Sequence, residues 1–418
     1  MDKKIIKRDL FNPLKAHLQH KEMTLVVGPR QAGKTTLLRL LEKECKAAGG
    51  KTLFLNLDID QDRQFFSTQQ MLVDHIQLSV GRDGGFIFID EAQRREDAGR
   101  FFKGLYDMDL PYKFILSGSG SLELKEKIHE SMMGRKRLFE LLPVSFREFA
   151  AIRTADQYGD ELWAALRADS LLPASLLDEY MRFRGYPQVV VTAEASEKLH
   201  ILNEIYQSYL VRDISFLLGV EKTDAFTNLT RILGSQIGKL AAVSELASTL
   251  DISVPTVRQY IWYLEQTFIV QRVPPYFSNT RSEITKMPTF YFYDLGLRNF
   301  VLHQSADAAF VDGFLFQNLV FLLLREQFGS LSHPIRFWRS KSGAEVDFVE
   351  EKGTRLIPIE VKHASFREPV IGKSLRSFIS RYQPEQAYII TREYAHSLKV
   401  DSTTIHFLPF YELYELRF

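Results

Sequence analysis

The most constraining feature of the chain is an eight-residue segment near its N-terminus. Residues 28–35 read Gly-Pro-Arg-Gln-Ala-Gly-Lys-Thr, which satisfies the pattern G-x-x-x-x-G-K-S/T. An apolar run, 23–27, precedes this segment, and a run with helical spacing, 36–41, follows it. Such a loop between a strand and a helix directs backbone N–H groups and the positive helix end toward phosphate oxygens. The segment therefore predicts a phosphate-binding loop.

The loop residues have distinct expected parts in holding a nucleoside triphosphate. Lys34 reaches the β- and γ-phosphates, and the hydroxyl of Thr35 holds Mg²⁺. We therefore predict ATP and Mg²⁺ as cofactors, and the alternative is a glycine-rich turn that binds no nucleotide. The predicted nucleotide-binding residues of the loop are Gly28, Pro29, Arg30, Gln31, Ala32, Gly33, Lys34, Thr35 and Thr36.

Composition excludes several other classes of protein. The chain has 418 residues, 45% of them hydrophobic and 25% charged, which is typical of a soluble protein with two or three domains. Its 53 Lys and Arg residues nearly balance its 52 Asp and Glu residues, so nucleic-acid contact would need a local basic patch. A single cysteine, Cys45, excludes an intrachain disulfide and a cysteine-based zinc cluster, and its helical surroundings indicate packing.

No segment of the sequence is apolar for long enough to cross a bilayer. The first nine residues contain no continuous apolar stretch, and the longest later run is 319–324. We therefore expect a cytoplasmic protein without a membrane partner.

A second motif, which ends in two acidic residues, follows the loop. Residues 86–91 read Phe-Ile-Phe-Ile-Asp-Glu, after another expected strand at 52–57. An unbroken apolar strand is typical of a parallel sheet buried on both faces, where its final acids emerge beside the phosphate loop. This is the form of a Walker B segment, in which Asp90 binds Mg²⁺ and Glu91 activates the attacking water. A solvated acidic turn is the alternative.

Two later segments add candidates for the same site. A strand beginning at Phe114 ends in small hydroxyl residues, and Ser117 and Ser119 are candidates to sense the γ-phosphate, or else form an ordinary turn. Arg135 precedes an apolar strand at 138–142. Because a loose phosphoryl transition state is stabilised by a guanidinium, Arg135 is the candidate arginine finger, in cis or from a neighbour in a homo-oligomer. A structural salt bridge is its alternative role.

Several segments together carry a family resemblance. The sequence resembles a prokaryotic family of AAA-type ATPases, called archaeal-ATPase-like, that carry a C-terminal domain of unknown function. The resemblance implies an ATP-hydrolysing core coupled to a DNA-associated C-terminal half. The matching segments are GPRQAGKTTLL at 28–38, FIFIDEAQ at 86–93, ILSGSGSLEL at 115–124, GRKRLFELLPVSFREF at 134–149, RGYPQVV at 184–190 and YLVRDI at 209–214.

The middle of the chain is expected to be helical. Residues 151–225 are interpreted as a lid or connector, in which Arg212 and Asp213 form caps or interdomain pairs, or sense nucleotide. Residues 243–250, the turn 251–253 and residues 254–265 then have the spacing of a helix-turn-helix. Ser253 is placed to cap the second helix.

That second helix has an inner and an outer face. Val257, Ile261 and Leu264 are expected to face inward, and Thr256, Arg258 and Gln259, residue types that read DNA grooves, to face outward. The strand expected from Phe268 would complete a winged helix. DNA is therefore a predicted partner, and a protein contact or a purely structural module is the alternative.

Near the C-terminus, two strands alternate around the turn 351–354. With Lys352 and Gly353 as a two-residue turn, Glu345 would lie opposite Glu360, with Asp347 on the same face. Asp347 followed by Glu360-Val-Lys362 resembles the D…E-x-K core of metal-dependent restriction-type nucleases, which implies a second Mg²⁺ site.

One position departs from the nuclease pattern. In such nucleases a preceding helix often supplies a glutamate, and here that position is Gln317, whose neutral amide weakens cation binding. Cleavage of DNA, a nuclease-shaped DNA-binding domain and a structural role therefore all remain open. Phe314, Leu315, Leu319 and 322–324 of this helix are interpreted as core.

The predicted fold class is α/β, with a P-loop AAA-type core at 1–150, a helical connector at 151–225, a winged-helix-like module at 226–290 and a nuclease-like α/β domain at 291–418. The predicted function is Mg²⁺-dependent ATP hydrolysis by a protein that acts on DNA or is regulated by it. A nucleotide switch that binds a protein partner and an ATP-gated nuclease are the alternatives.

Overall fold

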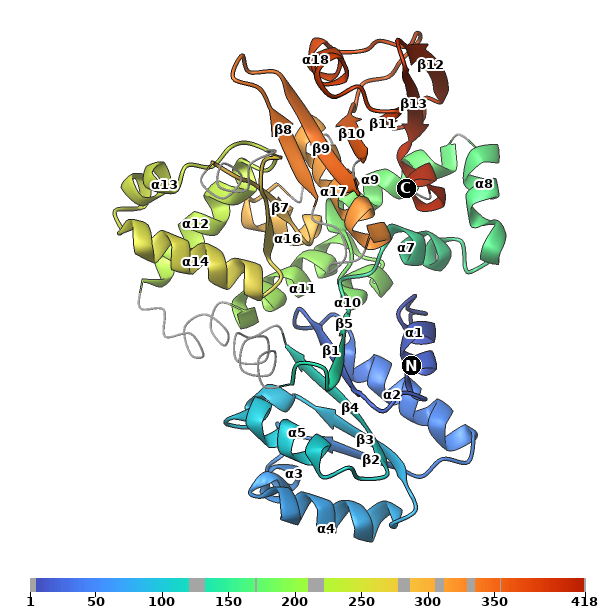
Figure 1. Ribbon diagram of the computed structural model, residues 1–418, viewed down its shortest axis with the longest axis vertical. Coiled ribbons are helices and arrows are strands. Elements are labelled where there is room, and N and C mark those ends of the chain that lie inside the picture. The colour runs from blue at the N-terminus through green and yellow to red at the C-terminus, as the bar shows by residue number, and fades with distance from the viewer. Residues whose placement is uncertain are drawn as a thin grey trace.

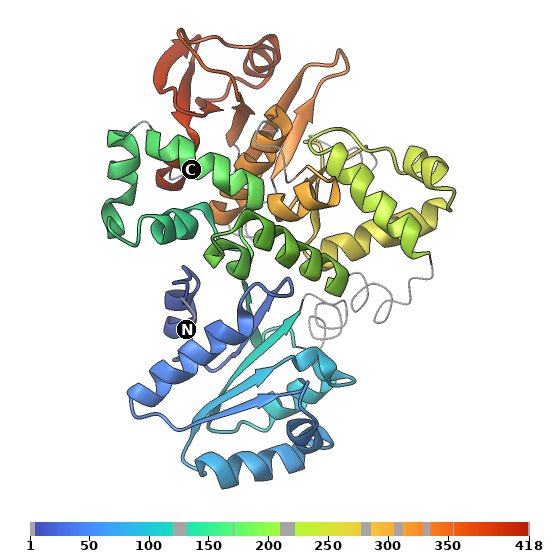
Figure 2. The same cartoon turned by 180° about the vertical axis from the view of Figure 1, so that it is seen from behind.

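The computed structural model describes residues 5–119, 132–169, 171–209, 222–276, 286–304, 312–328, 335–353 and 355–416. These residues form two lobes (Figures 1 and 2). The first lobe, coloured blue to cyan, holds one β-sheet with helices on both faces. The chain leaves it through β5 and builds the second lobe, and both views mark the N-terminus near the junction of the two.

The sheet of the first lobe consists of five parallel strands in the order β2-β3-β4-β1-β5. All five expected strands are confirmed, and the parallel arrangement agrees with the prediction from the apolar run before Asp90. The strands are β1 (Met23–Gly28), β2 (Thr52–Asn56), β3 (Gly85–Asp90), β4 (Tyr112–Ser119) and β5 (Lys136–Glu140).

Helices cover both faces of this sheet, which is why its strands are apolar at nearly every position. Val26, Phe88 and Ile115 pack in one cluster with α1 (Phe11–His17) and α2 (Lys34–Ala47). The alternate strand residues pack in another cluster with α4 (Gln69–Val80) and α5 (Ala98–Asp107). Cys45 is buried on α2, as predicted. Short connections are formed by α3 (Asp60–Arg63), η1 (Gln64–Phe66) and η2 (Ala92–Arg94).

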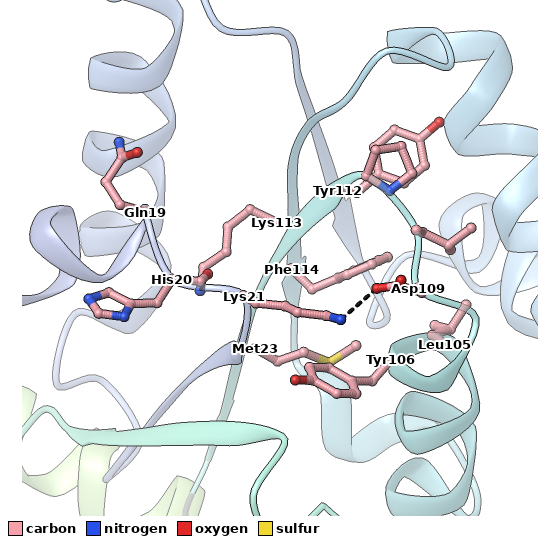
Figure 3. Close-up of a pocket in the computed structure, with 12 residues that line it drawn as sticks. Gln19, His20, Lys21, Met23, Leu105, Tyr106, Asp109, Tyr112, Lys113 and Phe114 are labelled. Atoms are coloured by element: carbon pink, nitrogen blue, oxygen red, sulfur yellow. Dashed lines mark hydrogen bonds and ion pairs between the residues drawn. The ribbon is translucent and has the colours of Figure 1, made fainter.

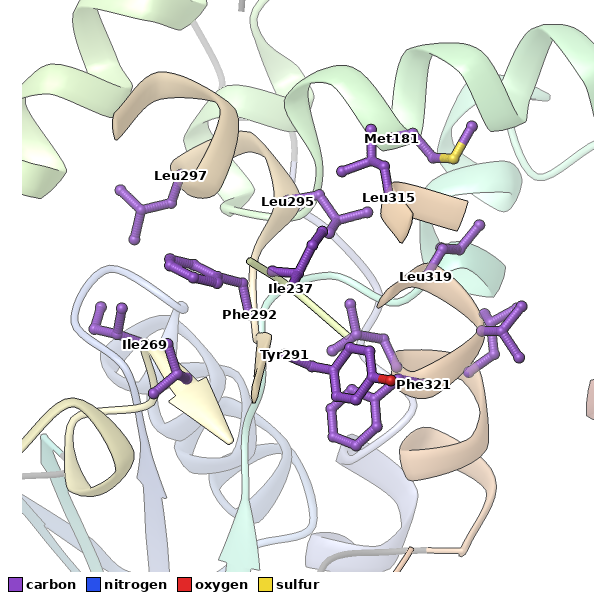
Figure 4. Close-up of a cluster of buried hydrophobic side chains, with 14 of the residues drawn as sticks. Met181, Ile237, Ile269, Tyr291, Phe292, Leu295, Leu297, Leu315, Leu319 and Phe321 are labelled. Carbon is purple, nitrogen blue, oxygen red and sulfur yellow. The ribbon is translucent and has the colours of Figure 1, made fainter. Parts of the chain in front are cut away.

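One hydrophobic cluster runs through the second lobe and includes residues of its helices and of its C-terminal sheet. Figure 4 shows the part of this cluster around Tyr291 and Leu319. Met181, Ile237, Tyr291, Leu295 and Leu319 all belong to it, although they come from four separate elements and the turn 236–238. The helices that follow β5 are α7 (Phe146–Arg153), η3 (Gly159–Glu161), α8 (Leu162–Ala168), α9 (Leu171–Phe183), α10 (Pro187–Val191) and α11 (Ala195–Ser208).

The two helices expected between 243 and 265 are confirmed. They are α13 (Val243–Leu250) and α14 (Val254–Gln266), preceded by α12 (Thr223–Ser235). The Ser253 side chain accepts a hydrogen bond of 3.2 Å from the backbone N–H of Thr256, which is the predicted cap. The residues expected to face inward on α14 are buried, whereas Arg258 and Gln259 are exposed. An antiparallel pair, β6 (Val270–Val273) and β7 (Thr289–Phe292), follows.

The C-terminal sheet has six strands in the order β12-β13-β11-β10-β9-β8. Its inner residues join the large cluster with α17 (Gly313–Phe328), and its other face packs against α18 (Lys373–Tyr382). Its strands are β8 (Arg336–Arg339), β9 (Glu345–Lys352), β10 (Arg355–Val361), β11 (Gln386–Thr391), β12 (His396–Val400) and β13 (Thr403–Pro409), with α16 (Leu295–Val301) before α17 and η5 (Phe410–Glu415) at the end. Within the described part of the chain, the model contains no helix that combines the length and apolarity of a membrane span.

The predicted register of β9 and β10 is wrong by two residues. Lys352 pairs with Arg355, and the ladder continues to Phe348 with Ile359, so Glu360 lies beside Asp347 and not opposite Glu345. The turn begins one residue later than expected, with Gly353, whose φ of 62° is left-handed, at its first position. The Asp347 and Glu360 carboxyls remain close, because the Glu360 charge contributes to raising the pKa of Asp347.

The helix α17 also differs from its prediction at one position. Leu315, Leu319 and residues 322–324 are buried core residues, as expected. Phe314 is 39% exposed and does not belong to the core.

Candidate nucleotide-binding site

Both loop glycines are required, for different physical reasons. The loop starts at the carboxyl end of β1 and ends at the first residues of α2. Gly33 has φ of 95°, a left-handed conformation that residues with a Cβ rarely adopt. Gly28 instead packs against the residue that follows β5, so that a Cβ there would be 2.1 Å from the carbonyl oxygen of Leu141. The pattern of two glycines therefore reflects one backbone bend and one close approach between strands.

The predicted Mg²⁺ ligands lie in direct contact. The Thr35 hydroxyl donates a hydrogen bond of 2.6 Å to Oδ2 of Asp90, and the Ser117 hydroxyl donates to the other carboxylate oxygen. Asp90 and Ser117 are almost fully buried, because β4 lies between β1 and β3 in the sheet. Lys34 folds over the loop, with Nζ 3.1 Å from the Gly28 carbonyl oxygen and 2.7 Å from that of Pro29. A hydroxyl and a buried carboxylate beside this lysine fit a Mg²⁺ ion bound with phosphate.

Glu91 has an unusual backbone and a perturbed carboxyl group. Its φ of 56° is left-handed, a conformation that non-glycine residues adopt mainly at special positions such as functional sites. Burial raises the pKa of Glu91, and the positive charge of Lys34 partly opposes this rise. The Gln93 amide donates a hydrogen bond to Oε2 of Glu91, which fixes the direction of the carboxylate. A carboxylate with a raised pKa is a stronger base toward water.

The phosphate loop opens into a pocket of about 680 Å³ that both lobes line. The first lobe contributes Lys34, Thr35, Glu91 and neighbouring loop residues. The second lobe contributes Pro187, Gln188 and Val191 from α10, and Glu204 and Ser208 from α11. Sequence reasoning missed these residues, although the segment 184–190 was one of those that carry the family resemblance. A nucleotide in this pocket would contact both lobes.

Arg8 is a further residue that sequence reasoning missed. Its guanidinium donates from Nη1 to the Ala32 carbonyl of the loop at 2.8 Å, and from Nη2 to the Leu142 carbonyl at 2.6 Å. Its Nε lies 3.1 Å from Oε2 of Glu148, the residue that forms the capping box of α7. The guanidinium therefore ties the loop to the start of the second lobe. No local pattern signals this role, because the three partners are far from Arg8 in sequence.

The structure does not bring every predicted site residue to this pocket. Arg135 lies at the amino edge of the sheet, where its carbonyl accepts a hydrogen bond from Met23 N–H and its Nε lies 2.7 Å from Asp107. Because the loop is at the opposite edge, the expectation of an arginine finger in cis is not supported by this position. Ser119 pairs in register with Gly28, and its side chain lies outside the described residues, as do Arg212 and Asp213.

A smaller pocket, of about 290 Å³, lies at that amino edge (Figure 3). Lys21 and Asp109 form an ion pair of 2.6 Å across it, and burial lowers the pKa of Lys113 to about 8. Lys113 donates to the carbonyl oxygens of His20 and Glu22, so its charge serves to hold the turn before β1. None of the predicted site residues lines this pocket.

In the second lobe, the predicted acid and lysine cluster is assembled around Asp347. Its Oδ1 accepts a hydrogen bond of 3.0 Å from the Gln317 amide, and its Oδ2 accepts one of 2.7 Å from Val361 N–H. Lys362 Nζ lies 2.6 Å from Oε1 of Glu360. Burial and the neighbouring Glu360 charge raise the pKa of Asp347 to about 7. Glu345 instead pairs with Arg339 at 3.0 Å.

The fit of this cluster to a second cation is mixed. Oε2 of Glu360 is buried without a hydrogen-bond partner, which favours a missing ligand. Gln317 points its amide nitrogen, and not its oxygen, toward Asp347. Throughout the described residues, no group of three or more His, Cys, Asp and Glu side chains is arranged to hold a metal ion. The cluster therefore offers two carboxylates and a lysine.

The Arg8 contacts predict a measurable effect on nucleotide affinity. In Arg8→Ala the loop loses its hydrogen bond from the guanidinium, and we expect the dissociation constant of a fluorescent ATP analogue to rise about tenfold, corresponding to ~1.4 kcal/mol. Arg147→Ala is the matched control, because that side chain is 46% exposed and lies 3.6 Å from Asp9. Equal affinity in Arg8→Ala and the wild type would mean that the loop keeps its shape without this contact.

Three family models match successive parts of the chain. Residues 20–150 match a model described as an AAA domain. Residues 174–308 and 312–413 match two models described as domains of unknown function, DUF8612 and DUF4143. The first match contains the phosphate loop and the acids at Asp90 and Glu91.

Similar proteins occur in several organisms. An uncharacterized protein of Mycobacterium tuberculosis is 29% identical over 398 residues, covering 92% of this chain and 80% of the relative. An uncharacterized protein of Haemophilus influenzae is 24% identical and covers 97% of this chain and 98% of the relative. One from Methanocaldococcus jannaschii is 24% identical, with coverages of 83% and 75%.

Solved structures with some similarity include those of Cdc6p and DnaA. Cdc6p from Pyrobaculum aerophilum has a TM-score of 0.31 at 11% identity, and covers 73% of this chain and 96% of its own. AMPPCP-bound DnaA from Aquifex aeolicus has a TM-score of 0.27 at 15% identity, with coverages of 63% and 89%. At such TM-scores the likeness carries no conclusion about this chain. The AAA-domain match, together with the loop and sheet described above, supports an AAA-type P-loop ATPase core within residues 20–150.

Proposed function

We propose that this protein hydrolyses ATP in a Mg²⁺-dependent reaction and couples that reaction to DNA. The observation that supports the hydrolytic part most strongly is the convergence of Lys34, the Thr35–Asp90 pair and Glu91 at the carboxyl edge of a parallel sheet. In open α/β sheets that edge is where ligands bind.

Each group has a distinct part in the proposed reaction. Lys34 and the loop N–H groups neutralise the β- and γ-phosphates, and Thr35 and Asp90 would hold Mg²⁺. The ion, when bound, stabilises the negative charge that develops during phosphoryl transfer. Glu91 takes the proton of the attacking water, a task that its burial assists by strengthening it as a base. Ser117, hydrogen-bonded to Asp90, is placed to respond to the ion and the γ-phosphate.

The two-lobed pocket supports coupling to the second lobe. α10 and α11 line the pocket beside the phosphate loop, and Arg8 links that loop to α7. ATP binding and phosphate release therefore change what these helices contact. The second lobe exposes Arg258 and Gln259 on α14, which supports DNA as the partner that senses or receives this change.

Two substitutions test the hydrolytic assignment. Lys34→Ala removes the phosphate-binding ammonium, and we expect loss of nucleotide binding or turnover. Glu91→Gln keeps the shape of the site but removes the base, so binding should persist while steady-state phosphate release stops. Because the pKa of Glu91 is raised, wild-type turnover should decline on the acid side at a higher pH than an ordinary glutamate would give.

The matched control for these variants is Lys43→Ala, since Lys43 is exposed on the same helix as Lys34. It should hydrolyse ATP like the wild type. Wild-type hydrolysis by both Lys34→Ala and Glu91→Gln would overturn the assignment.

A panel of DNA substrates tests the coupling. We expect duplex, single-stranded or branched DNA to stimulate ATP hydrolysis, and Arg258→Ala to reduce that stimulation because a phosphate or base contact is lost. Arg100→Ala, an exposed arginine of α5, is the control. Particle mass measured with and without nucleotide would show whether a homo-oligomer forms. Absence of stimulation, with a stable ATP-bound state, would instead favour a nucleotide switch that binds a protein.

A second candidate function is ATP-gated cleavage of DNA. The observation that favours it is the unpaired, buried Oε2 of Glu360 beside Asp347 and Lys362. A buried carboxylate oxygen without a donor is suited to a cation, and a lysine beside it is suited to positioning water.

Cleavage can be measured with a labelled DNA panel in Mg²⁺ or Mn²⁺. If the cluster is catalytic, Asp347→Ala and Lys362→Ala should abolish the products, and Gln317→Glu should increase them because it adds a carboxylate to the cation site. Lys341→Ala, on the exposed turn before β9, is the control. No products from the wild type or from Gln317→Glu in either metal would remove this candidate.

A further inference from the structure

The first turn of α17 carries an aromatic side chain that the core does not use. Phe314 is 39% exposed, whereas the next residues of the same helix that face the sheet are fully buried. A lone exposed aromatic on a protein surface is common and needs no explanation. The surroundings of this one are unusual, because a lysine and the acid cluster both lie next to it.

Lys239 covers one side of the Phe314 ring. Its Nζ lies 4.9 Å from the ring centroid, a distance at which an ammonium is attracted by the face of an aromatic ring. Lys239 is exposed, and no carboxylate within the described residues lies at ion-pair distance from it. Its charge is therefore available to a phosphate in solvent.

The ring is also adjacent to the acid cluster. Gly238, which precedes this lysine, packs so closely that a Cβ on it would lie 3.0 Å from Oε1 of Gln317 and 3.2 Å from Cδ1 of Phe314. The amide nitrogen of Gln317 is in turn hydrogen-bonded to Asp347. The ring is therefore linked to the Asp347 carboxylate through Gly238 and the buried Gln317 amide, between the helix-turn-helix region and the C-terminal sheet. On the far side of this contact chain, the Lys362 side chain is 40% exposed and forms an ion pair with Glu360.

We propose that Phe314 and Lys239 form a binding site for an unpaired nucleotide, with the base stacked on the phenyl ring and a neighbouring phosphate contacting the lysine. Stacking on an aromatic ring beside a cation is how proteins bind single-stranded nucleic acid without reading its sequence. The proposal rests on the proposed DNA-coupled function and adds that the nucleic acid next to the acid cluster is single-stranded. A base in this position would bring its backbone to Asp347, Glu360 and Lys362.

Fluorescence of 2-aminopurine tests this site directly, because stacking on a ring quenches its emission. Single-stranded DNA and RNA oligonucleotides of mixed sequence, each with one 2-aminopurine, are titrated with the full chain in EDTA. Anisotropy of a terminal fluorescein measures the affinity in the same samples. We expect quenching by the wild type, and weak or absent quenching when the labelled base is in a duplex. Quenching with DNA alone would mean that the site takes a deoxynucleotide, and quenching with both DNA and RNA would mean that it takes either.

The variants separate stacking from general binding. Phe314→Leu keeps an apolar side chain but removes the ring, and should abolish the quenching and weaken affinity about tenfold, whereas Phe314→Tyr should retain both. Lys239→Ala should weaken binding and reduce its salt dependence, and Lys239→Arg should restore it. Leu78→Ala, which removes an 88% exposed side chain of α4 in the first lobe, is the control and should match the wild type.

These measurements distinguish failure of the stacking site from failure of the proposed function. If the wild type binds single strands but Phe314→Leu quenches 2-aminopurine equally well, the stacking site is wrong and DNA coupling stands. If the wild type binds neither single-stranded nor duplex nucleic acid, both proposals fail. If Phe314→Leu and Phe314→Tyr melt at the same temperature, loss of quenching in Phe314→Leu does not arise from unfolding.

Discussion

The buried carboxylate of Asp90 is the constraint on which the nucleotide site depends. A carboxylate removed from water is costly unless donors or cations surround it, and here Thr35 and Ser117 provide hydroxyl donors from two other elements. These donors can reach it only because β4 separates β3 from β1, so that three parallel strands end at one edge. Burial of this one carboxylate thus depends on the strand order, on the glycine-rich loop and on the start of α2.

The second constraint is how the two lobes meet around that edge. The Arg8 guanidinium donates hydrogen bonds to carbonyl oxygens of the loop and of the segment after β5. It also donates one to Glu148 of the α7 capping box. Arg325 of α17 also reaches back to Glu140 of β5 at 2.7 Å, with both side chains largely buried. Buried charged pairs of this kind specify one arrangement, because removing either partner leaves an uncompensated charge. The pocket therefore has a defined wall from α10 and α11.

The second lobe combines parts that the sequence suggested were separate. One hydrophobic cluster includes residues of the expected connector, of the helix-turn-helix region and of the C-terminal sheet. The close contact of Gly238 with Phe314 and Gln317 lies within this continuity. Consequently the exposed face of α14, the Phe314 ring and the Asp347 cluster belong to one packed lobe.

Local patterns of glycine, apolar runs and capping residues were enough to predict the loop at 28–35, the five strands of the first lobe and the helices at 243–250 and 254–265. The sequence also brought Asp347 and Glu360 together on neighbouring strands, and the structure keeps them close although the register differs by two residues. That register was visible only in the tertiary structure, because Gly353 can take part in the turn in either register. Tertiary structure alone also revealed Arg8 beside the loop, put Arg135 at the opposite edge and left Phe314 exposed. Each of these depends on contacts between residues distant in sequence, and no local pattern encodes such contacts.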